Sequence, residues 1–112
     1  MLVVSANKIQ LTRGDTMILE VTLRDEKGDV YTPLETDKIY FRLKRNATAK
    51  DTLIVKEIPY DTRILQLNEN DTKDLKFGVY YYEIELVTNA NYHFTAIANT
   101  EFEITEELES HG

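Results

Sequence analysis

Few side chains of this chain could carry out chemistry, and the histidines come first. His93 and His111 are the only two, and there is no cysteine. A zinc site fixes three or four ligands in space. His93 falls on an expected strand and His111 in the terminal segment, so nothing in the spacing brings such ligands together. We therefore expect no metal and no cofactor.

Nucleophiles and carboxylate pairs also give no catalytic pattern. Ser5 and Ser110 are the only serines, both near the termini, and no glycine-rich phosphate loop follows a strand. Glu83 and Glu85 alternate along one expected strand, which places both on its outer face. Carboxylates on such a face are expected to be solvated rather than to form an acid/base pair. We predict that the protein is not an enzyme.

Two short motifs invite a binding interpretation. Arg13-Gly14-Asp15 spells the integrin-binding tripeptide, but three residues recur by chance, and Gly14 and Asp15 suit a turn between two strands. The acidic groups at Glu69–Thr72 and Asp25–Asp29 lack the ladder of oxygen ligands that a calcium loop needs. We expect turn formation in all three places.

Tyrosines are the remaining candidates for a binding surface. Tyr40, Tyr60, Tyr81 and Tyr92 could form a sugar- or protein-binding surface. Tyr81 and Tyr40 are the most suggestive because the alternation points both outward and tyrosine is enriched at interfaces. Single exposed aromatic residues are also normal on sheets. We take Tyr81 and Tyr40 as candidate interface residues.

Length and charge restrict the class of protein. The 112 residues suit one domain, and 42% of them are hydrophobic, as in a globular protein. The formal charge is 13 − 20 = −7, which argues against nucleic acid and against an anionic membrane surface as partners. The N-terminal segment lacks the basic start and the ~7–15 apolar residues of a signal peptide. We expect a protein made in the cytoplasm without a signal peptide.

The hydrophobic pattern repeats every two residues, which predicts strands rather than helices. Seven or eight short strands separated by turns indicate a sandwich or a small barrel. One helical turn is expected at Asn70–Leu75, capped by Asn or Asp. The expected strands cover Lys8–Thr12, Thr16–Arg24, Lys38–Lys44, Leu53–Ile58, Arg63–Leu67, Val79–Val87 and Tyr92–Thr105.

Two turns and one bulge can be specified. Asp25–Gly28 suits a type I turn that closes with Gly28 at positive φ. Leu86 and Phe94 should both face inward, so opposed residue numbers must sum to an even value. This parity predicts a three-residue loop, 89–91, with Asn91 in the left-handed conformation. A bulge near Asn99 would reconcile the two halves of the last strand.

The alternation also predicts the core and the extent of the domain. Residues 1–105 should form the domain, and residues 106–112 an acidic, frayed tail. Tyr92 should also be buried. The expected core consists of Leu19, Val21, Leu23, Ile39, Phe41, Leu43, Leu65, Leu67, Tyr80, Tyr82, Ile84, Leu86, Phe94, Phe102 and Ile104.

The tyrosine-rich strand indicates which all-β fold the chain adopts. Gly78, then Tyr80, then alternating apolar residues is the layout of the penultimate strand of an immunoglobulin-like sandwich. Tyr80 is the candidate tyrosine corner, with its hydroxyl bonded to backbone in the turn between Asp71 and Lys76. Tyr82 occupies the position that a disulfide cysteine usually takes. We predict an all-β, immunoglobulin-like antiparallel β-sandwich of seven to eight strands.

Several segments resemble a known family. They are residues 11–16 (LTRGDT), 23–28 (LRDEKG), 39–44 (IYFRLK), 71–84 (DTKDLKFGVYYYEI) and 102–104 (FEI). Together they resemble the immunoglobulin-like domain at the N-terminus of phage baseplate upper proteins and related small structural proteins of phages and prophages of Gram-positive bacteria. The resemblance implies a virion part, made in the bacterial host cytoplasm and incorporated in the particle. It also implies docking onto other virion subunits or onto itself as a homo-oligomer, with no catalytic residues.

Two functions follow as expectations. The first is a non-enzymatic structural or assembly module of the tail, baseplate or neck, acting through protein–protein contacts. The alternative is a carbohydrate- or surface-binding module that uses the exposed tyrosines. Gly14, Gly28, Gly78 and Tyr80 have structural roles under both hypotheses.

Overall fold

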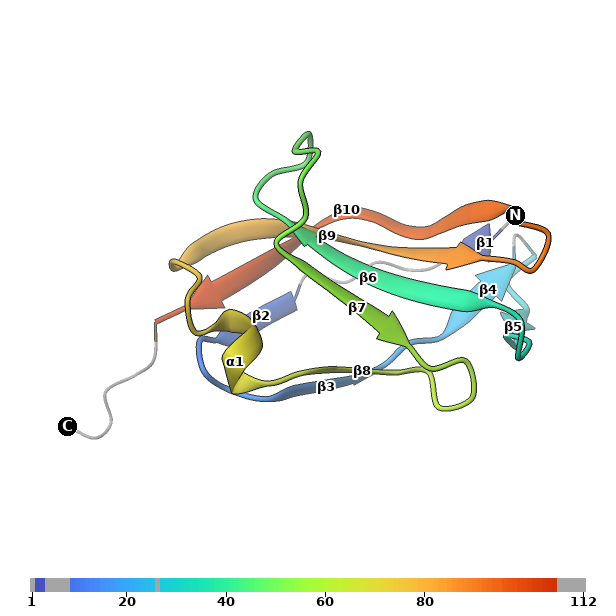
Figure 1. The fold of residues 1–112 in the computed structure, drawn as a ribbon, viewed down its shortest axis with the longest axis horizontal. Coiled ribbons are helices and arrows are strands. Elements are labelled where there is room, and N and C mark those ends of the chain that lie inside the picture. Colours follow the sequence, from blue (N-terminus) through green and yellow to red (C-terminus); the bar gives the residue numbers. More distant parts are fainter. Residues whose placement is uncertain (1, 4–8, 26, 107–112) are drawn as a thin grey trace.

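The computed structural model describes residues 2–3, 9–25 and 27–106 of the chain (Figure 1). These residues form ten strands and one short helix, so the all-β prediction is confirmed. The elements are β1 (Leu2–Val3), β2 (Ile9–Thr12), β3 (Met17–Glu20), β4 (Leu23–Asp25), β5 (Val30–Tyr31), β6 (Lys38–Lys44), β7 (Ile54–Ile58), β8 (Ile64–Leu67), α1 (Glu69–Thr72), β9 (Gly78–Val87) and β10 (His93–Thr105).

The strands form three sheets. The largest has the order β2-β10-β9-β6-β7, a second pairs β3 with β8, and a third has the order β1-β4-β5. In Figure 1 the long strands β6, β9 and β10 run together, and β3 and β8 run side by side below them. The five-stranded sheet carries most of the buried side chains and both candidate interface tyrosines.

Two details of the predicted fold class are wrong. The pairing of β2 with β10 is parallel, with Leu11 opposite Ile104, whereas every other strand pair described is antiparallel. The described residues form ten strands, whereas seven to eight were predicted. The expected strand Thr16–Arg24 is interrupted at residues 21–22, because β3 pairs with β8 whereas β4 pairs with β1 and β5. Strands β1 and β5 have two residues each, too few for a repeat of two to be visible.

Strand β10 contains two register shifts where the sequence predicted one bulge. Phe94 lies opposite Leu86, and Phe102 lies opposite Tyr80. The shifts lie between Thr95 and Ile97 and between Ile97 and Thr100. The second includes the expected position near Asn99. A single extra residue would turn every later side chain to the other face. The second shift restores the inward orientation of Phe102.

The predicted core is confirmed with three corrections. Tyr92 is 65% exposed and Leu19 is 36% exposed, and Phe94 is only partly buried. Tyr92 ends the 89–91 loop outside the sheet, and Leu19 lies on a strand with one described neighbour. Pattern reasoning also missed some buried side chains. The buried apolar residues are Leu11, Val21, Leu23, Ile39, Phe41, Leu43, Ile54, Ile58, Leu65, Leu67, Tyr80, Tyr82, Ile84, Leu86, Phe102 and Ile104.

The predicted turns are confirmed. Gly28 has φ +89° and its N–H donates to the Asp25 carbonyl at 3.0 Å. Asn91 has φ +64°, and its N–H donates to the Thr88 carbonyl at 2.8 Å. The Thr88 N–H in turn donates to the Tyr92 carbonyl at 2.9 Å, which closes the three-residue loop. Side-chain parity therefore fixes this hairpin correctly.

Helix α1 forms near the expected position and begins one residue earlier, at Glu69. Asn68 is its N-cap residue, and the Asp71 carboxylate accepts the Asn68 N–H at 2.7 Å. Such capping satisfies donors that the first helical turn leaves free. Asp71 also pairs with Lys56 of β7 at 3.0 Å, and Thr72 is fully buried. The helix is thereby tied to the five-stranded sheet.

The hydrogen bond predicted for the Tyr80 hydroxyl is present. The Tyr80 hydroxyl donates to the Lys76 carbonyl at 2.7 Å, within the segment named from the sequence. Two residues later, Tyr82 packs against Phe41 and Phe102, with ring centroids 5.7 and 6.2 Å away. An aromatic cluster therefore occupies the interior at this position. Of the expected tail, Glu106 is exposed, and residues 107–112 lie outside the described residues.

Candidate functional site

Tyr40 and Tyr81 both lie on the outer face of the five-stranded sheet, as the alternation predicted. They stand on neighbouring strands: Tyr40 of β6 is opposite Glu85, and Tyr81 of β9 is opposite Lys44. Arg42 and Glu83 form the pair that lies between them along the two strands. Both tyrosine side chains are half-buried. Charged residues therefore separate the rings of Tyr40 and Tyr81, so the two rings do not form one continuous aromatic surface.

These charged residues form a network that we call the outer-face ion network, consisting of Arg42, Lys44, Glu83, Glu85 and His93. Arg42 Nη1 lies 2.8 Å from Glu85 Oε1 and 3.9 Å from Glu83 Oε2. Lys44 Nζ lies 2.9 Å from Glu83 Oε1, and His93 Nδ1 lies 3.2 Å from Glu85 Oε2. The sequence predicted solvated carboxylates. Only 23% of the Glu83 side chain and 19% of the Glu85 side chain are exposed, so this prediction is wrong.

The network changes the acidity of one carboxyl group. Burial alone would raise the pKa of Glu85, but hydrogen bonds from Arg42 and His93 outweigh it, and the pKa is lowered. The Arg42 guanidinium also lies 5.2 Å from the centroid of the Tyr40 ring, within the range of a cation–π contact. These contacts link the side chains of the two strands. The face can present charges of both signs and two half-buried aromatic rings to a partner.

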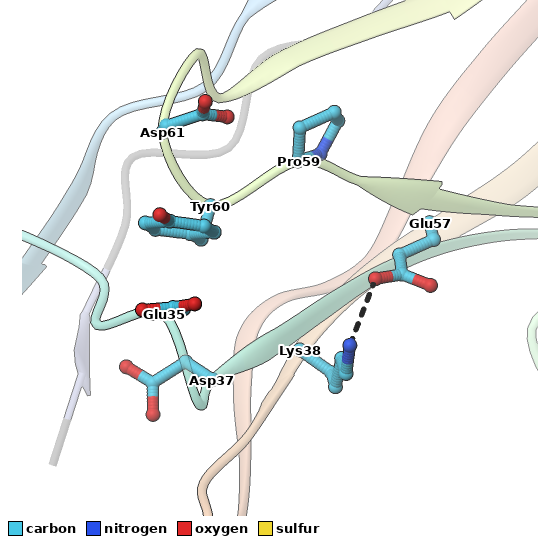
Figure 2. A pocket seen from close by; sticks show the side chains of 7 residues that line it. All are labelled: Glu35, Asp37, Lys38, Glu57, Pro59, Tyr60 and Asp61. Atoms are coloured by element: carbon cyan, nitrogen blue, oxygen red, sulfur yellow. Dashed lines mark ion pairs between the residues drawn. The ribbon is translucent and has the colours of Figure 1, made fainter.

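A groove at one end of the sheet is the second candidate (Figure 2). Its volume is about 460 Å³. It is formed by the segment before β6, the start of β6, the end of β7 and the following turn. Tyr60 faces Glu35 across the groove in Figure 2. Its lining residues are Glu35, Asp37, Lys38, Glu57, Pro59, Tyr60 and Asp61.

Three of the charged groups in the groove, Asp37, Lys38 and Glu57, already have partners. Lys38 Nζ lies 3.6 Å from Glu57 Oε2. Asp37 is buried and accepts hydrogen bonds from the Tyr31 hydroxyl at 2.7 Å and the Leu34 N–H at 2.9 Å. Burial and the neighbouring Asp37 carboxylate raise the pKa of Tyr31 to about 12. Asp37 therefore fixes the loop that forms one wall.

The free part of the groove combines an aromatic ring with carboxylates. Tyr60 is 37% exposed, and Glu35 and Asp61 are also exposed. An aromatic face beside carboxylates can contact a hydroxyl-rich or a cationic group. The sequence named Tyr60 among the tyrosines but did not identify the groove. Its lining residues come from separate segments, and only the Pro59-Tyr60-Asp61 turn was visible as a local signal.

The two turn segments predicted around Gly14 and Asp25 are stabilised by hydrogen bonds. Arg13 lies over the Phe77 ring at 4.2 Å from its centroid. Gly14 has φ +90°, and its N–H donates to Thr72 Oγ1 at 3.4 Å. Asp25 Oδ1 accepts the N–H groups of Lys27 and Asp29 at 2.9 and 3.0 Å. These contacts favour the turn interpretation of both segments, whereas the third segment, Glu69–Thr72, forms the short helix α1.

Gly78 and His93, two further residues considered from the sequence, lie on β9 and β10. Gly78 opens β9 with φ +144°, a conformation that favours glycine. His93 is exposed beside Glu85, and His111 lies outside the described residues. Within residues 2–3, 9–25 and 27–106, no three histidine or acidic side chains are grouped so that they could hold a metal ion. In the same part of the chain, no helix has the length and apolar character needed to cross a bilayer.

The comparisons with known proteins add no relative. No protein-family model matches the chain, and neither the curated proteins nor the solved structures contain one that is significantly similar.

Proposed function

We propose that the domain is an immunoglobulin-like sandwich. The order β10-β9-β6-β7 corresponds to the G-F-C-C′ order of a variable-type sheet. Under this correspondence Tyr80 lies on strand F, where the tyrosine corner belongs, and Phe41 lies on strand C, where a buried Trp is usual. β3 and β8 then correspond to strands B and E of the facing sheet. The Tyr80–Lys76 hydrogen bond is the contact that most favours this assignment.

We propose that the protein is a non-enzymatic assembly module of a phage or prophage particle, acting through protein–protein contacts in the tail, baseplate or neck. The observation that carries the proposal is the exposure of large apolar side chains on strands and loops. Ile18 is 65% exposed, Leu34 62% and Val55 52%. Covering the exposed part of such a side chain in an interface is favourable, because apolar surface is removed from water. The resemblance of residues 11–16, 23–28 and 71–84 to baseplate-type domains is the reason for proposing a phage or prophage particle.

Gene deletion tests this function. In the organism that encodes the chain, we expect deletion of its coding sequence to reduce the yield of complete particles after prophage induction. Expression of the wild-type chain from a plasmid should restore the yield. Unchanged particle number, morphology and infectivity in the deletion strain would contradict the proposal. Electron microscopy and plaque counts provide the two measurements.

A second function is favoured by the groove. Tyr60 offers an aromatic face beside exposed carboxylates in a cavity of about 460 Å³, the combination used to bind hydroxyl-rich ligands. The alternative is therefore a carbohydrate- or surface-binding module. Tyr60 is more exposed than Tyr40 or Tyr81, so we place the binding surface at the groove.

A glycan array distinguishes the two functions. A carbohydrate-binding module should bind a defined set of glycans, and Tyr60→Ala should abolish that binding. Tyr92→Ala is the matched control, because Tyr92 is also an exposed tyrosine at a loop and does not line the groove. Tyr81→Ala tests the outer face of the sheet separately. Absence of glycan binding by the wild-type protein would remove the alternative.

A further inference from the structure

Among the described residues, strand β3 is an edge of the two-stranded sheet. β3 pairs with β8 along one side, and the described residues provide no second neighbour. Leu19 shares a face with Leu65 and Leu67, which are both buried, yet 36% of Leu19 remains exposed. Ile18, on the opposite face, is 65% exposed. Apolar side chains on both faces therefore meet solvent at this edge.

Strand β7, an edge of the five-stranded sheet, differs from β3 because a charged side chain lies on its inward face. Lys56 lies on the inward face between the buried residues Ile54 and Ile58, and it pairs with Asp71 at 3.0 Å. An inward-pointing charge on an edge strand opposes pairing with another chain, because the charge would be carried into the joined sheet. The edge at β7 is protected in this way.

Strand β3 itself carries no inward-pointing charge. Its four residues are Met17, Ile18, Leu19 and Glu20, and only Glu20 is charged. Glu20 already pairs with Arg63 at 3.3 Å. The other edge of the five-stranded sheet, β2, presents less apolar surface, since its Leu11 is buried. Two other described edges, β5 and β8, also carry no charge. The apolar side chains that they expose, Val30 at 50% and Ile64 at 39%, are less exposed than Ile18 of β3 at 65%. Of these three edges, β3 therefore has the most exposed apolar side chain.

We propose that β3 pairs antiparallel with β3 of a second copy of this chain, across a two-fold axis at Ile18. The inference deepens the proposed assembly function by naming the partner. A two-fold contact places the same patch of both copies together. Ile18 then lies opposite its own mate, Met17 lies opposite Leu19, and Glu20 lies opposite Thr16. The two sheets join in the order β8-β3-β3-β8.

The register argues for a second copy as the occupant. With the axis at Ile18, Met17 and Leu19 meet on the inward face, and each covers the apolar edge that the other leaves exposed. With the axis one residue later, at Leu19, Ile18 would face the Glu20 carboxylate. One residue earlier, at Met17, Leu19 would face Asp15. Apolar and charged side chains would then be opposed, which cross-strand pairing disfavours. The sequence is self-complementary about Ile18.

Sedimentation equilibrium of the purified protein tests this pairing. We expect the mass to rise with concentration from 13.0 kDa to twice that value. Ile18→Lys brings two ammonium groups together at the axis and should weaken the dimer at least ~100-fold. Val55→Lys is the matched control: Val55 is an exposed β-branched residue on β7, and this variant should dimerise like the wild type. An equimolar mixture of Ile18→Lys and Ile18→Glu should regain the dimer.

Cysteine crosslinking tests the register. The chain has no cysteine, so a single introduced thiol can pair only with that of another copy. Opposed antiparallel residues lie ~4.5–5.5 Å apart between Cα atoms, within the ~4.4–6.8 Å range of disulfides. Under mild oxidation, Ile18→Cys should form a covalent dimer at least ~10-fold faster than Val55→Cys. That is the expected order because only position 18 lies on the axis.

Three results would overturn the proposal. The first is a wild-type protein that stays monomeric up to ~1 mM, which would place any dissociation constant above that value. The second is a dimer that Ile18→Lys leaves intact. The third is equal crosslinking at positions 18 and 55. A monomer whose Ile18→Lys variant is lost from particles would overturn the second copy as partner and leave the assembly function standing. A dimer that never enters particles would contradict the assembly function alone.

Discussion

The Tyr80 hydroxyl makes the contact on which the strand assignment most depends. It donates to the Lys76 carbonyl at 2.7 Å, and the Tyr80 ring is buried in the core. Removing the hydroxyl leaves that carbonyl without its partner while the ring stays in place. At the scale of single residues, such contacts can be tested by substitutions that remove one atom or that change the backbone φ angle a residue prefers.

Tyr80→Phe should lower the free energy of unfolding by about 1 kcal/mol, the usual net contribution of one hydrogen bond. Urea denaturation measures the loss. Tyr60→Phe is the control, because the same atom is removed from an exposed ring, and its unfolding midpoint should not change. Equal midpoints for Tyr80→Phe and the wild type would contradict the tyrosine corner as a stabilising contact.

Asn91 holds the 89–91 loop in the left-handed conformation, at φ +64°. Asn91→Ala should cost about 1–2 kcal/mol, because a Cβ atom without a compensating side-chain hydrogen bond disfavours this region. Asn91→Gly should cost nothing or stabilise slightly, since glycine adopts positive φ freely. Thermal and urea unfolding of the two variants provide the comparison. An alanine variant as stable as the glycine variant would refute the strain argument.

Arg63 shows where prediction from residue type ends. Its φ is +54°, and its Nε is buried without a hydrogen-bond partner in the described structure. Asn91 was predictable because pairing parity fixed the loop length and asparagine tolerates the left-handed region. Arginine has no such preference. Its conformation follows from the Pro59–Arg63 turn, whose closing bond joins the Arg63 N–H to the Pro59 carbonyl at 2.8 Å.

At the scale of elements, β6 and β9 form the centre of the domain. Their register places Phe41 opposite Ile84 and Leu43 opposite Tyr82, so alternate residues of both strands are buried. The alternation was sufficient to predict these two strands almost to the residue. It could not predict the interruption between β3 and β4, since the hydrophobic alternation continues through residues 21 and 22 while the pairing partners change.

Phe41→Ala should lower the free energy of unfolding by ~3–5 kcal/mol. Phe41 is fully buried and contacts the rings of Tyr82 and Phe102, so its removal leaves a cavity that rigid neighbours cannot fill. Denaturant titration measures this loss. A cost below about 1 kcal/mol would place Phe41 outside the centre of the core.

The ion pairs on β7 and β9 predict a response to acid. Burial would raise the pKa of both Asp71 and Glu85, but hydrogen bonds from Asn68 and Lys56 lower the first, and those from Arg42 and His93 lower the second. A lowered pKa in the folded state means that the unfolded chain binds more protons in acid. The contribution to stability is complete above about pH 5 and is lost as pH falls through the lowered values.

Urea midpoints between about pH 6 and pH 3 test this linkage, since the unfolded carboxyl groups titrate near pH 4. Glu85→Gln should flatten the decline in stability toward acid. Glu106→Gln, at an exposed position, is the charge-matched control and should keep the slope of the wild type. If Glu85→Gln shows the same slope as the wild type, the outer-face ion network does not stabilise the fold.

At the scale of the whole molecule, the candidate sites follow from how separate elements meet. The outward direction of Tyr40 and Tyr81 was predictable from alternation. The Arg42–Glu85 pair between β6 and β9 was not, because it depends on the register of strands 43 residues apart in sequence. The groove at Tyr60 depends on how the segment before β6 meets the turn after β7, and the edge at β3 depends on the order of the strands. Local patterns do not determine either arrangement.

The molecule as a whole is proposed to act by occupying a fixed place in a particle. Exposed apolar side chains, an unprotected β3 edge and the resemblance to baseplate-type domains support that role. The decisive test is therefore whether the chain is present in assembled particles. Binding measured with the purified protein alone does not answer this question.

Quantitative mass spectrometry of gradient-purified particles from induced cultures makes this test most directly. We expect peptides of the chain to co-migrate with the particles at a constant ratio to the major structural proteins in every particle fraction. Peptides found only in the soluble fractions, and absent from the particle fractions, would contradict the proposed function.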